Sequence, residues 1–438
     1  MRIHIFCVRD LRDYLDAMTD MSEFNALPDF DPQFAPFADA PDIQKFLFDM
    51  MKFYKNRDEA LSAPVVGETG IDGLRLDFNF GLRLDVPEGN FRVKIGEVGG
   101  QTFFDREISA VRIVSFEKFF VRWRVEVFSG GEKIFEHDLD FDGQSVLIAP
   151  TSSALGDTLA MLPAVEELRR RNRCRVSVRL PEYLREFVAH VYPEIVLDDT
   201  GEYYATFYPN WFCGNIPINP IDPRFGNIAK VLGANFGIDW FAPKPTFKPT
   251  APPVTNSPYV CIGVQASVNR KAWLYPNGWD IVVDYLQRLG YRVFCIDKDS
   301  SQTSDSVTIG KPSNAEDFTG DFSIMHRANM LYHAEFFIGL SSGLAWLADA
   351  VNCPVVMICG FSYDWFEFDT PWRVTNRRVC GGCLNDERMS EFLYGARCPR
   401  FGGTVREFEC QKKISPQQVI DAIERLIVDR HLTVPILS

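Results

Sequence analysis

Four of the eleven cysteines in this 438-residue chain lie close together near the C-terminus. Cys380 and Cys383 form a Cys-Gly-Gly-Cys segment, and Cys398 and Cys410 follow it. Two cysteines three positions apart can turn both sulfur atoms toward one point, and a second pair can complete a tetrahedral shell of four thiolates. The spacing therefore predicts a metal site between residues 380 and 410, and it is compatible with either zinc or iron.

Two disulfides, or four unrelated thiols, are the alternatives for this cluster. Disulfides need an oxidising compartment, but residues 1–16 carry six charged side chains and no apolar segment, so we expect no export signal. The sequence thus favours a metal site in a cytoplasmic protein. The other seven cysteines are scattered, several of them in apolar runs, and are predicted to be reduced core residues.

Asp157 is the carboxylate that a loop of small residues, 151–158, offers between a predicted strand and a predicted helix. A carboxylate at this place can act as a general base. An Asp at the start of a helix can equally be an N-cap that accepts hydrogen bonds from free main-chain amides. The spacing alone leaves both roles open.

Lys271 and Arg270 are adjacent cations in the loop 263–276, which follows another predicted strand of this acidic chain. Such a pair suits a diphosphate, although a lone Lys is most often a solvated surface residue. The neighbouring Trp273, Tyr275 and Pro276 indicate a packed, specific loop and favour a binding role.

A third loop, Ser341-Ser342-Gly343-Leu344, places two hydroxyls and a glycine amide at the start of a predicted helix. Free amides and the helix dipole favour phosphate at such a position. The alternative is an ordinary Ser N-cap.

The three loops must be positioned by α/β elements, because short apolar strands alternate with helical periodicity from residue 146 onward. We predict a first lobe at 146–247, a proline-rich linker at 248–258, and a second lobe at 259–438 that includes the cysteine segment. Two such lobes imply a ligand cleft at the carboxyl ends of their strands. This architecture suits a transferase that uses a sugar nucleotide.

Residues 1–145 differ from the rest, since alternating runs such as 74–80 and 119–128 predict a β-rich domain. The turn at residues 129–132 predicts a hairpin. This domain is either a structural cap or a contact surface for an acceptor or another subunit. The net charge of −13 argues against a nucleic-acid or anionic-membrane partner, and no apolar run is long enough to span a bilayer.

The order of these motifs resembles a known family. The Gly-Asp loop, the segment from Arg270 to Trp279, the Ser-Ser-Gly-Leu-Ala-Trp segment and the late cysteines are similar to the bacterial autotransporter heptosyltransferases, relatives of the lipopolysaccharide-core ADP-heptose transferases of glycosyltransferase family 9. The resemblance covers most of the chain from about residue 146. It implies a GT-B fold and inverting transfer of heptose from ADP-heptose to serine hydroxyls of an autotransporter adhesin.

The resemblance also implies an iron ion in the cysteine site and a large homo-oligomer, often a dodecamer. Asp157 matches the general base, Lys271 the cation that contacts the donor, and residues 341–344 the phosphate loop. In the core heptosyltransferases this loop reads Asp-Thr-Gly-Leu, with a His three residues after the Gly. Here Ser341 replaces that Asp and Trp346 replaces that His, which alters the expected sugar contacts. The residues that fall near nucleoside and sugar positions are Ser267, Asp297 and Phe322.

Two other functions stay open from the sequence. A lipopolysaccharide-core heptosyltransferase, or another nucleotide-sugar glycosyltransferase of the same fold, would have no need for the N-terminal domain or the cysteine segment. A metal-stabilised interaction scaffold would use the Asp157 and Lys271 loops only as caps. The negative net charge makes a zinc-dependent nucleic-acid binder a poor third choice.

Overall fold

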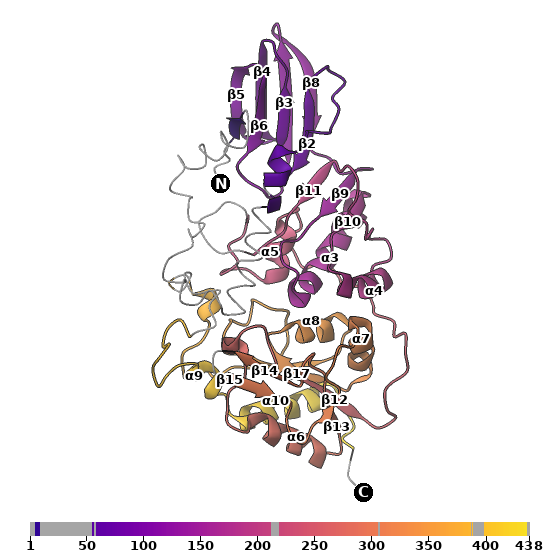
Figure 1. Ribbon diagram of the computed structural model, residues 1–438, viewed down its shortest axis with the longest axis vertical. Coiled ribbons are helices and arrows are strands. Elements are labelled where there is room, and N and C mark those ends of the chain that lie inside the picture. Colours follow the sequence, from indigo (N-terminus) through magenta and orange to yellow (C-terminus); the bar gives the residue numbers. More distant parts are fainter. Residues whose placement is uncertain are drawn as a thin grey trace.

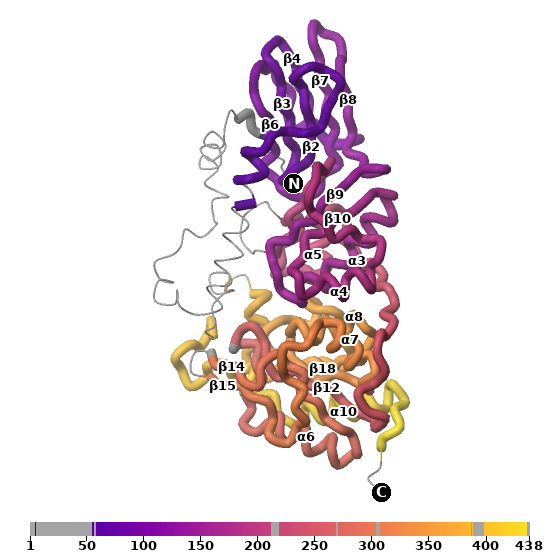
Figure 2. Tube along the Cα trace, turned by 45° about the vertical axis from the view of Figure 1, so that its right-hand side comes forward, coloured from indigo at the N-terminus to yellow at the C-terminus, as the bar shows by residue number. Residues whose placement is uncertain are grey.

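The computed structural model describes residues 5–8, 55, 56, 58–211, 219–304, 307–386, 388 and 398–435. They form three parts stacked along the long axis of the molecule: an antiparallel sheet at one end, a first α/β lobe in the middle and a second α/β lobe at the other end (Figure 1). The view in Figure 2 shows the same order after a turn of 45°.

The part at the N-terminal end is a four-stranded antiparallel sheet. In β7 (Trp123–Ser129) the alternating Trp123, Val125 and Val127 are buried, which fixes the face that packs on the core. Gly130 and Gly131, both with positive φ, turn the chain into β8 (Glu132–Asp138). The pairing of β7 with β8 confirms the predicted hairpin. The sheet is completed by β4 (Phe91–Glu97) and β5 (Thr102–Ile108), in the order β5-β4-β7-β8.

The first lobe is built on a seven-stranded sheet in the order β1-β6-β3-β2-β11-β9-β10. Strands β10, β9, β11 and β2 are parallel, and β3, β6 and β1 extend the sheet in antiparallel fashion. The sheet crosses the boundary predicted at residue 145, because β2 completes the main-chain hydrogen bonds of β11. The strands are β1 (Ile5–Val8), β2 (Arg75–Asn79), β3 (Arg83–Val86), β6 (Val111–Ser115), β9 (Ser145–Ile148), β10 (Arg175–Val178) and β11 (Ala205–Phe207).

In the part of this lobe that the structure describes, helices follow the parallel strands β9, β10 and β11. The strand, loop and helix predicted from residue 145 onward are observed, since β9 leads through a polar loop into α3 (Leu155–Asn172). The helix α4 (Glu182–Val191) follows β10, and α5 (Ile228–Ala234) follows β11. Asn227 caps α5 by accepting a hydrogen bond from the Ala229 amide.

The second lobe contains a six-stranded parallel sheet in the order β16-β13-β12-β17-β18-β19. Every residue of β12, β17 and β18 is buried, as expected for parallel strands covered on both faces. Counted along the chain, the order is third, second, first, fourth, fifth, sixth, which is a doubly wound topology. The strands are β12 (Tyr259–Gly263), β13 (Arg292–Cys295), β16 (Glu316–Asp317), β17 (Phe337–Leu340), β18 (Val355–Ile358) and β19 (Arg373–Val374).

Helices connect these strands, and a separate hairpin lies outside the sheet. The C-terminal helix begins with a capping box between Ser415 and Gln418 and carries Pro416 in its first turn. The elements are η2 (Asn269–Lys271), α6 (Gly278–Arg288), β14 (Ser301–Ser304), β15 (Val307–Gly310), α7 (Ile324–His333), α8 (Gly343–Ala350), η3 (Cys383–Asn385), α9 (Glu409–Lys412) and α10 (Pro416–Asp429).

The doubly wound order fixes where a ligand can bind. The direction of winding reverses between β12 and β17, and the loops that leave these two neighbouring strands open a crevice at their carboxyl ends. The loop after β12 carries Lys271, and the loop after β17 carries Ser341 and Ser342. The topology therefore brings two of the three predicted loops together.

The third loop reaches the same place because α3 of the first lobe packs against α8 of the second lobe. Two glycines permit the close approach. A Cβ atom on Gly156 would lie 2.9 Å from Cδ1 of Trp346, and one on Gly343 would lie 2.9 Å from Cβ of Leu155. Any larger residue at either position would push the two helix N-termini apart.

Further bonds hold the two lobes together. The Asn227 side chain donates to the main-chain oxygens of Trp365 and Glu367 at 3.0 and 2.6 Å, and Nζ of Lys244 lies 2.7 Å from Oδ1 of Asp349. Within the described ranges, we find no helix that is both long enough and apolar enough to cross a membrane.

A buried ion pair joins β2 to β3. Asp77 and Arg83 are opposite each other in the sheet, their side chains are each 1 % exposed, and Nη2 of Arg83 lies 2.6 Å from Oδ2 of Asp77. Arg83 also donates to the main-chain oxygens of Ala63 and Pro64, which ties down the segment before β2. The replacement Asp77→Ala leaves the guanidinium buried without its anion and should lower the free energy of unfolding by about 3–5 kcal/mol in calorimetry.

The matched control for this prediction is Asp105→Ala. Asp105 also makes two hydrogen bonds with an arginine, Arg92, but on the exposed face of the antiparallel sheet. Water screens that pair, so its loss should change the stability little. Equal losses from the two variants would contradict the role given to burial.

Candidate active site

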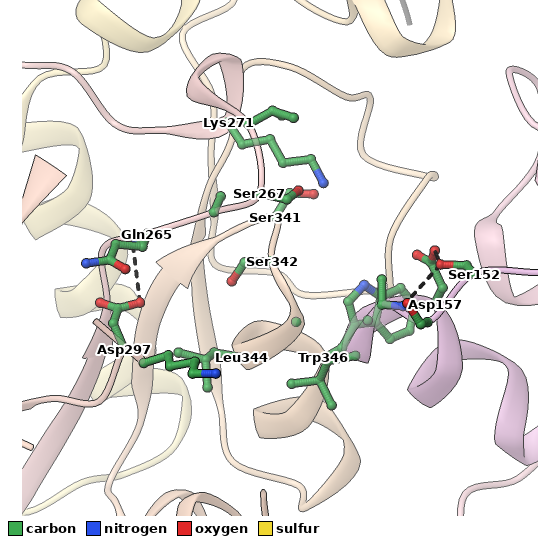
Figure 3. Close-up of a pocket in the computed structure, with 18 of the residues that line it drawn as sticks. Ser152, Asp157, Gln265, Ser267, Lys271, Asp297, Ser341, Ser342, Leu344 and Trp346 are labelled. Atoms are coloured by element: carbon green, nitrogen blue, oxygen red, sulfur yellow. Dashed lines mark hydrogen bonds between the residues drawn. The ribbon is translucent and has the colours of Figure 1, made fainter. Parts of the chain in front are cut away.

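A cavity of about 950 Å³ lies between the two lobes. Loops of the first lobe form one wall, and the loops that follow β12, β13, β17 and β18 form the other. All ten residues that the sequence placed in a catalytic or donor-binding role line this cavity (Figure 3). They are Asp157, Ser267, Lys271, Asp297, Phe322, Ser341, Ser342, Gly343, Leu344 and Trp346.

Asp157 is the third residue of α3 and is not its N-cap. The N-cap is Ala154, whose side chain makes no capping bond. Oδ2 of Asp157 accepts two hydrogen bonds from side chains, one from Oγ of Ser152 at 2.5 Å and one from Nε1 of Trp211 at 2.8 Å. The capping role left open by the sequence is therefore wrong, and the carboxylate belongs to the cavity (Figure 3).

Lys271 lies at the end of η2, on the opposite wall. Its Nζ is 5.8 Å from the centre of the Phe361 ring, and the guanidinium of Arg270 is 4.8 Å from the same ring. Arg270 is buried, whereas Lys271 is partly exposed at the cavity. In Figure 3 the ammonium group of Lys271 extends toward the loop that carries Ser341 and Ser342.

The loop after β17 presents an uncapped helix N-terminus. Ser342 is the N-cap of α8, but its side chain makes no capping bond. Its Oγ is buried and has no hydrogen-bond partner among the described residues. The first amides of α8, a hydroxyl and the helix dipole therefore face the cavity together, which suits a phosphate group.

Unlike the Ser342 hydroxyl, the Ser341 hydroxyl has a hydrogen-bond partner within the protein. Its Oγ donates to Oε1 of Glu367 at 2.5 Å. Oε1 of Glu367 also accepts a hydrogen bond from Oγ of Ser362, and Oε2 of Glu367 accepts one from the Arg373 guanidinium at 2.9 Å. The Ser341 side chain thus holds the loop in place, so only the main chain of Ser341 is available to contact a ligand.

Asp297 shapes the loop that follows β12. Its Oδ2 accepts from the Val264 amide at 2.7 Å and its Oδ1 from the Gln265 amide at 3.2 Å. The side chain is almost fully buried, and this burial raises its pKa to about 6, although the two amide bonds act in the opposite direction.

Phe322 and Ser267 are both exposed, and both line the cavity. The Phe322 ring stacks on His326 at 4.6 Å, and Arg327 holds the loop before α7 by donating to the main-chain oxygens of Gly320 and Phe322. An exposed ring on a fixed loop is a suitable surface for a nucleobase.

Trp211, Glu367 and Tyr183 are among the residues of the site that were not singled out from the sequence. Trp211 follows β11 in a loop without a motif, and Glu367 lies in the loop after β18. Tyr183 is the second residue of α4, and its hydroxyl donates to the Ser153 main chain at 2.6 Å. Burial raises the pKa of Tyr183 to about 12, and the Asp157 charge adds to this effect. No spacing in the sequence relates these residues to Asp157 or Ser341.

The four cysteines predicted as metal ligands lie in one region beside the cavity. The Cys380 amide donates to the Glu409 side chain, next to Cys410, and Arg400, two residues after Cys398, donates to the Gly381 main chain, so the segments that carry the four cysteines contact one another. Among the residues that the structure describes, however, no three Cys, His, Asp or Glu side chains are grouped as metal ligands. The four-cysteine metal site therefore stays a prediction.

The scattered cysteines are core residues where the structure describes them. Five are buried free thiols, and the side chains of Cys7 and Cys213 lie outside the described residues. The five are Cys174, Cys261, Cys295, Cys353 and Cys359.

The fold and the site define a glycosyltransferase of the GT-B-like class, and comparisons with known proteins agree. The family model "Glycosyltransferase family 9 (heptosyltransferase)" matches residues 225–387, and "Glycosyltransferase TibC, N-terminal domain" matches residues 70–131. A relative from Citrobacter rodentium, the autotransporter heptosyltransferase BAHTCr, is 37% identical over 82% of this chain and 90% of its own length. The chain belongs to the autotransporter heptosyltransferases.

Solved structures give the same result. The crystal structure of TibC from enterotoxigenic Escherichia coli H10407, described as an iron-containing dodecameric glycosyltransferase, superposes with a TM-score of 0.78. It is 34% identical in sequence and covers 85% of this chain and 100% of its own. A second TibC structure, in complex with ADP-D-β-D-heptose, has a TM-score of 0.77, with the same identity and coverage.

The raised pKa of Asp297 predicts a pH-dependent stability. A free Asp titrates near pH 3.9, whereas burial brings this one to about 6, so the folded chain binds the proton more tightly than the unfolded chain. The stabilising contribution is complete below about pH 4 and is lost as the pH rises through 6. Relative to Asp297→Asn, which cannot titrate there, the unfolding free energy should fall by roughly 2 kcal/mol from pH 4 to 7. A constant difference between the two proteins in denaturant titrations would refute this.

Proposed function

We propose that this protein transfers heptose from ADP-heptose to serine hydroxyls of an autotransporter adhesin, with inversion at the anomeric carbon. One observation carries the proposal: a carboxylate on one lobe faces an uncapped helix N-terminus and a lysine on the other lobe, across a single cavity. The ADP-heptose complex of TibC supports the choice of donor.

The diphosphate of the donor binds at the start of α8. Main-chain amides at Ser342 and Gly343, the Ser342 hydroxyl and the Lys271 ammonium supply donors and positive charge. These groups stabilise the charge that develops on the leaving ADP as the bond between the anomeric carbon and the phosphate oxygen breaks. The nucleoside lies toward Phe322, Ser267 and the loop that Asp297 holds in place.

Asp157 acts as the general base. It takes the proton of the acceptor serine while that oxygen forms a bond to the anomeric carbon, on the face opposite the departing phosphate. A carboxylate is a weak base, so the proton moves as the attack proceeds and not before it. A single displacement of this kind inverts the anomeric configuration.

Acceptor and subunit contacts are assigned to the N-terminal domain, residues 1–145. Its antiparallel sheet ends in β5 and β8, and such edge strands can pair with another chain. A large homo-oligomer is supported by the description of TibC as dodecameric. The cytoplasm is the expected location, because the donor is a nucleotide sugar.

An iron ion is assigned to Cys380, Cys383, Cys398 and Cys410. Two observations support it, namely the contacts between the segments that carry the four cysteines and the description of TibC as iron-containing. Four thiolates would occupy all positions of a tetrahedral metal, so its contribution is structural. The segment of these cysteines is tied to the cavity wall, since the Gly382 and Leu384 amides donate to the main-chain oxygens of Gly360 and Phe361.

The replacement Asp157→Asn tests the base. It keeps the size of the side chain but removes its ability to accept the proton, so the rate of transfer should fall by roughly 10²–10⁴. The affinity for ADP-heptose should stay within about twofold, because the assigned donor contacts lie elsewhere. Intact mass of a co-expressed autotransporter passenger measures transfer as heptose increments, and calorimetry measures the donor affinity.

Lys271→Ala is the complementary variant and should give the opposite pattern. Loss of a charge-assisted bond to the diphosphate should weaken ADP-heptose binding by roughly 10–100-fold. Full transfer by Asp157→Asn, or unchanged donor affinity in Lys271→Ala, would remove the corresponding assignment.

Removal of one cysteine ligand tests the metal. Cys380→Ser should reduce the iron measured by elemental analysis from about one ion per chain, abolish thiolate-to-iron absorption and lower the melting temperature. Cys174→Ser is the matched control, because Cys174 is a buried free thiol of the first lobe that donates to the Leu168 main chain. Full iron content in Cys380→Ser, or zinc in place of iron in the native protein, would contradict the assignment.

A further inference from the structure

The two oxygens of the Asp157 carboxylate have different surroundings. Oδ2 accepts both hydrogen bonds, from Ser152 at 2.5 Å and from Trp211 at 2.8 Å. Among the described residues, no hydrogen bond reaches Oδ1. The protein therefore holds one oxygen and leaves the other for a ligand in the cavity.

Ser152 and Trp211 hold Oδ2 from different elements of the first lobe. Ser152 lies in the loop before α3, and its Oγ also accepts from the Ala154 amide at 3.1 Å, so it is fixed by the backbone that starts the helix. Trp211 comes from the loop after β11 (Ala205–Phe207), 54 residues beyond Asp157 in the sequence. The two donors therefore restrain the carboxylate from two separate loops.

Trp211 also contacts the second lobe. Its ring meets Phe366 edge to face, with centroids 6.4 Å apart and planes at 67°. Phe366 is held in turn, because its main-chain oxygen accepts from the Ile228 amide of α5 at 2.9 Å. The indole thus lies between the carboxylate of one lobe and the wall of the other, and both residues line the cavity.

We infer that Trp211 is a positioning residue for the Asp157 base: its indole N–H fixes Oδ2 and thereby directs Oδ1 at the acceptor hydroxyl. This inference rests on the proposed role of Asp157. An indole N–H can donate but neither accept nor ionise, so it stabilises the charged carboxylate in one orientation at any working pH.

The hydrogen bond from Trp211 affects the rate because it fixes the orientation of the Asp157 carboxylate. A carboxylate at the end of a side chain turns easily, and a base acts only when its oxygen meets the proton within about 2.6–3.2 Å. A misplacement of about 1 Å can slow a reaction by roughly 100-fold. Since the Phe366 ring packs against the indole, correct placement of the base also requires the two lobes to keep their relative position.

The test is Trp211→Phe, which keeps an aromatic ring against Phe366 and removes the N–H. We expect kcat to fall by about 10–100-fold, while the KM for ADP-heptose and the melting temperature change little. A fall in kcat without a matching change in the KM for ADP-heptose separates a misplaced base from a weakened donor site.

A double-mutant cycle separates positioning from a general structural role. In an Asp157→Asn background, Trp211→Phe should have no further effect on the residual rate, because the group that it positions is gone. The matched control is Trp240→Phe in the same lobe. Trp240 packs against Arg171 and is not among the residues that line the cavity, so this variant should retain the native kcat.

Each outcome decides one question. A native kcat in Trp211→Phe would overturn the positioning role while leaving the base intact. So would equal losses from Trp211→Phe in the native protein and in the Asp157→Asn background. Retained transfer in Asp157→Asn alone would instead overturn the proposed role of Asp157 as the base, on which the inference rests. If Trp211→Phe loses stability, Ser152→Ala removes the other donor, and the same non-additivity with Asp157→Asn is expected.

Discussion

The close approach of two helix N-termini is the constraint on which the site depends. α3 brings the carboxylate and α8 brings the free amides, and the two helices meet where Gly156 faces Trp346 and Gly343 faces Leu155. A Cβ atom at either glycine would fall within 3 Å of the opposite lobe, closer than side chains normally pack. The separation between base and anion site is therefore set by the packing of the Gly156 main chain on the Trp346 ring and of the Gly343 main chain on the Leu155 side chain.

Much of this arrangement follows from the sequence, for a physical reason. Strands buried on both faces are short apolar runs, and the loops at their carboxyl ends are polar, so the order of strand, loop and helix is visible in the residues. The doubly wound order then brings the loops after β12 and β17 together. Asp157, Lys271 and Ser342 were predictable because each lies in such a loop or in the helical turn that follows it.

Other features depend on contacts between distant segments, which local patterns do not encode. Trp211 bonds to a residue 54 positions earlier, and Ser341 bonds to Glu367 from a different loop. Asp157 was ambiguous because an N-cap and a residue of the first helical turn look alike in sequence; the cap is Ala154. The boundary predicted at residue 145 marks a change of pattern, but β2 crosses it because β11 needs a hydrogen-bonded neighbour. Cysteine spacing predicts a four-thiolate metal site, but a ligand shell also requires side-chain directions, which spacing does not encode.

An acidic protein that binds a diphosphate must solve an electrostatic problem, and the cavity walls show how this chain does so. Three of the carboxylates that line the cavity each have their own hydrogen-bond donors. Asp297 has main-chain amides, Glu367 has Arg373 and two serine hydroxyls, and Asp157 has Ser152 and Trp211. Donors that already compensate these charges leave Lys271 and the α8 amides to act on an anion without strong opposition. The net charge of −13 therefore does not predict the charge of the ligand, because the groups closest to the diphosphate determine its electrostatic attraction to the protein.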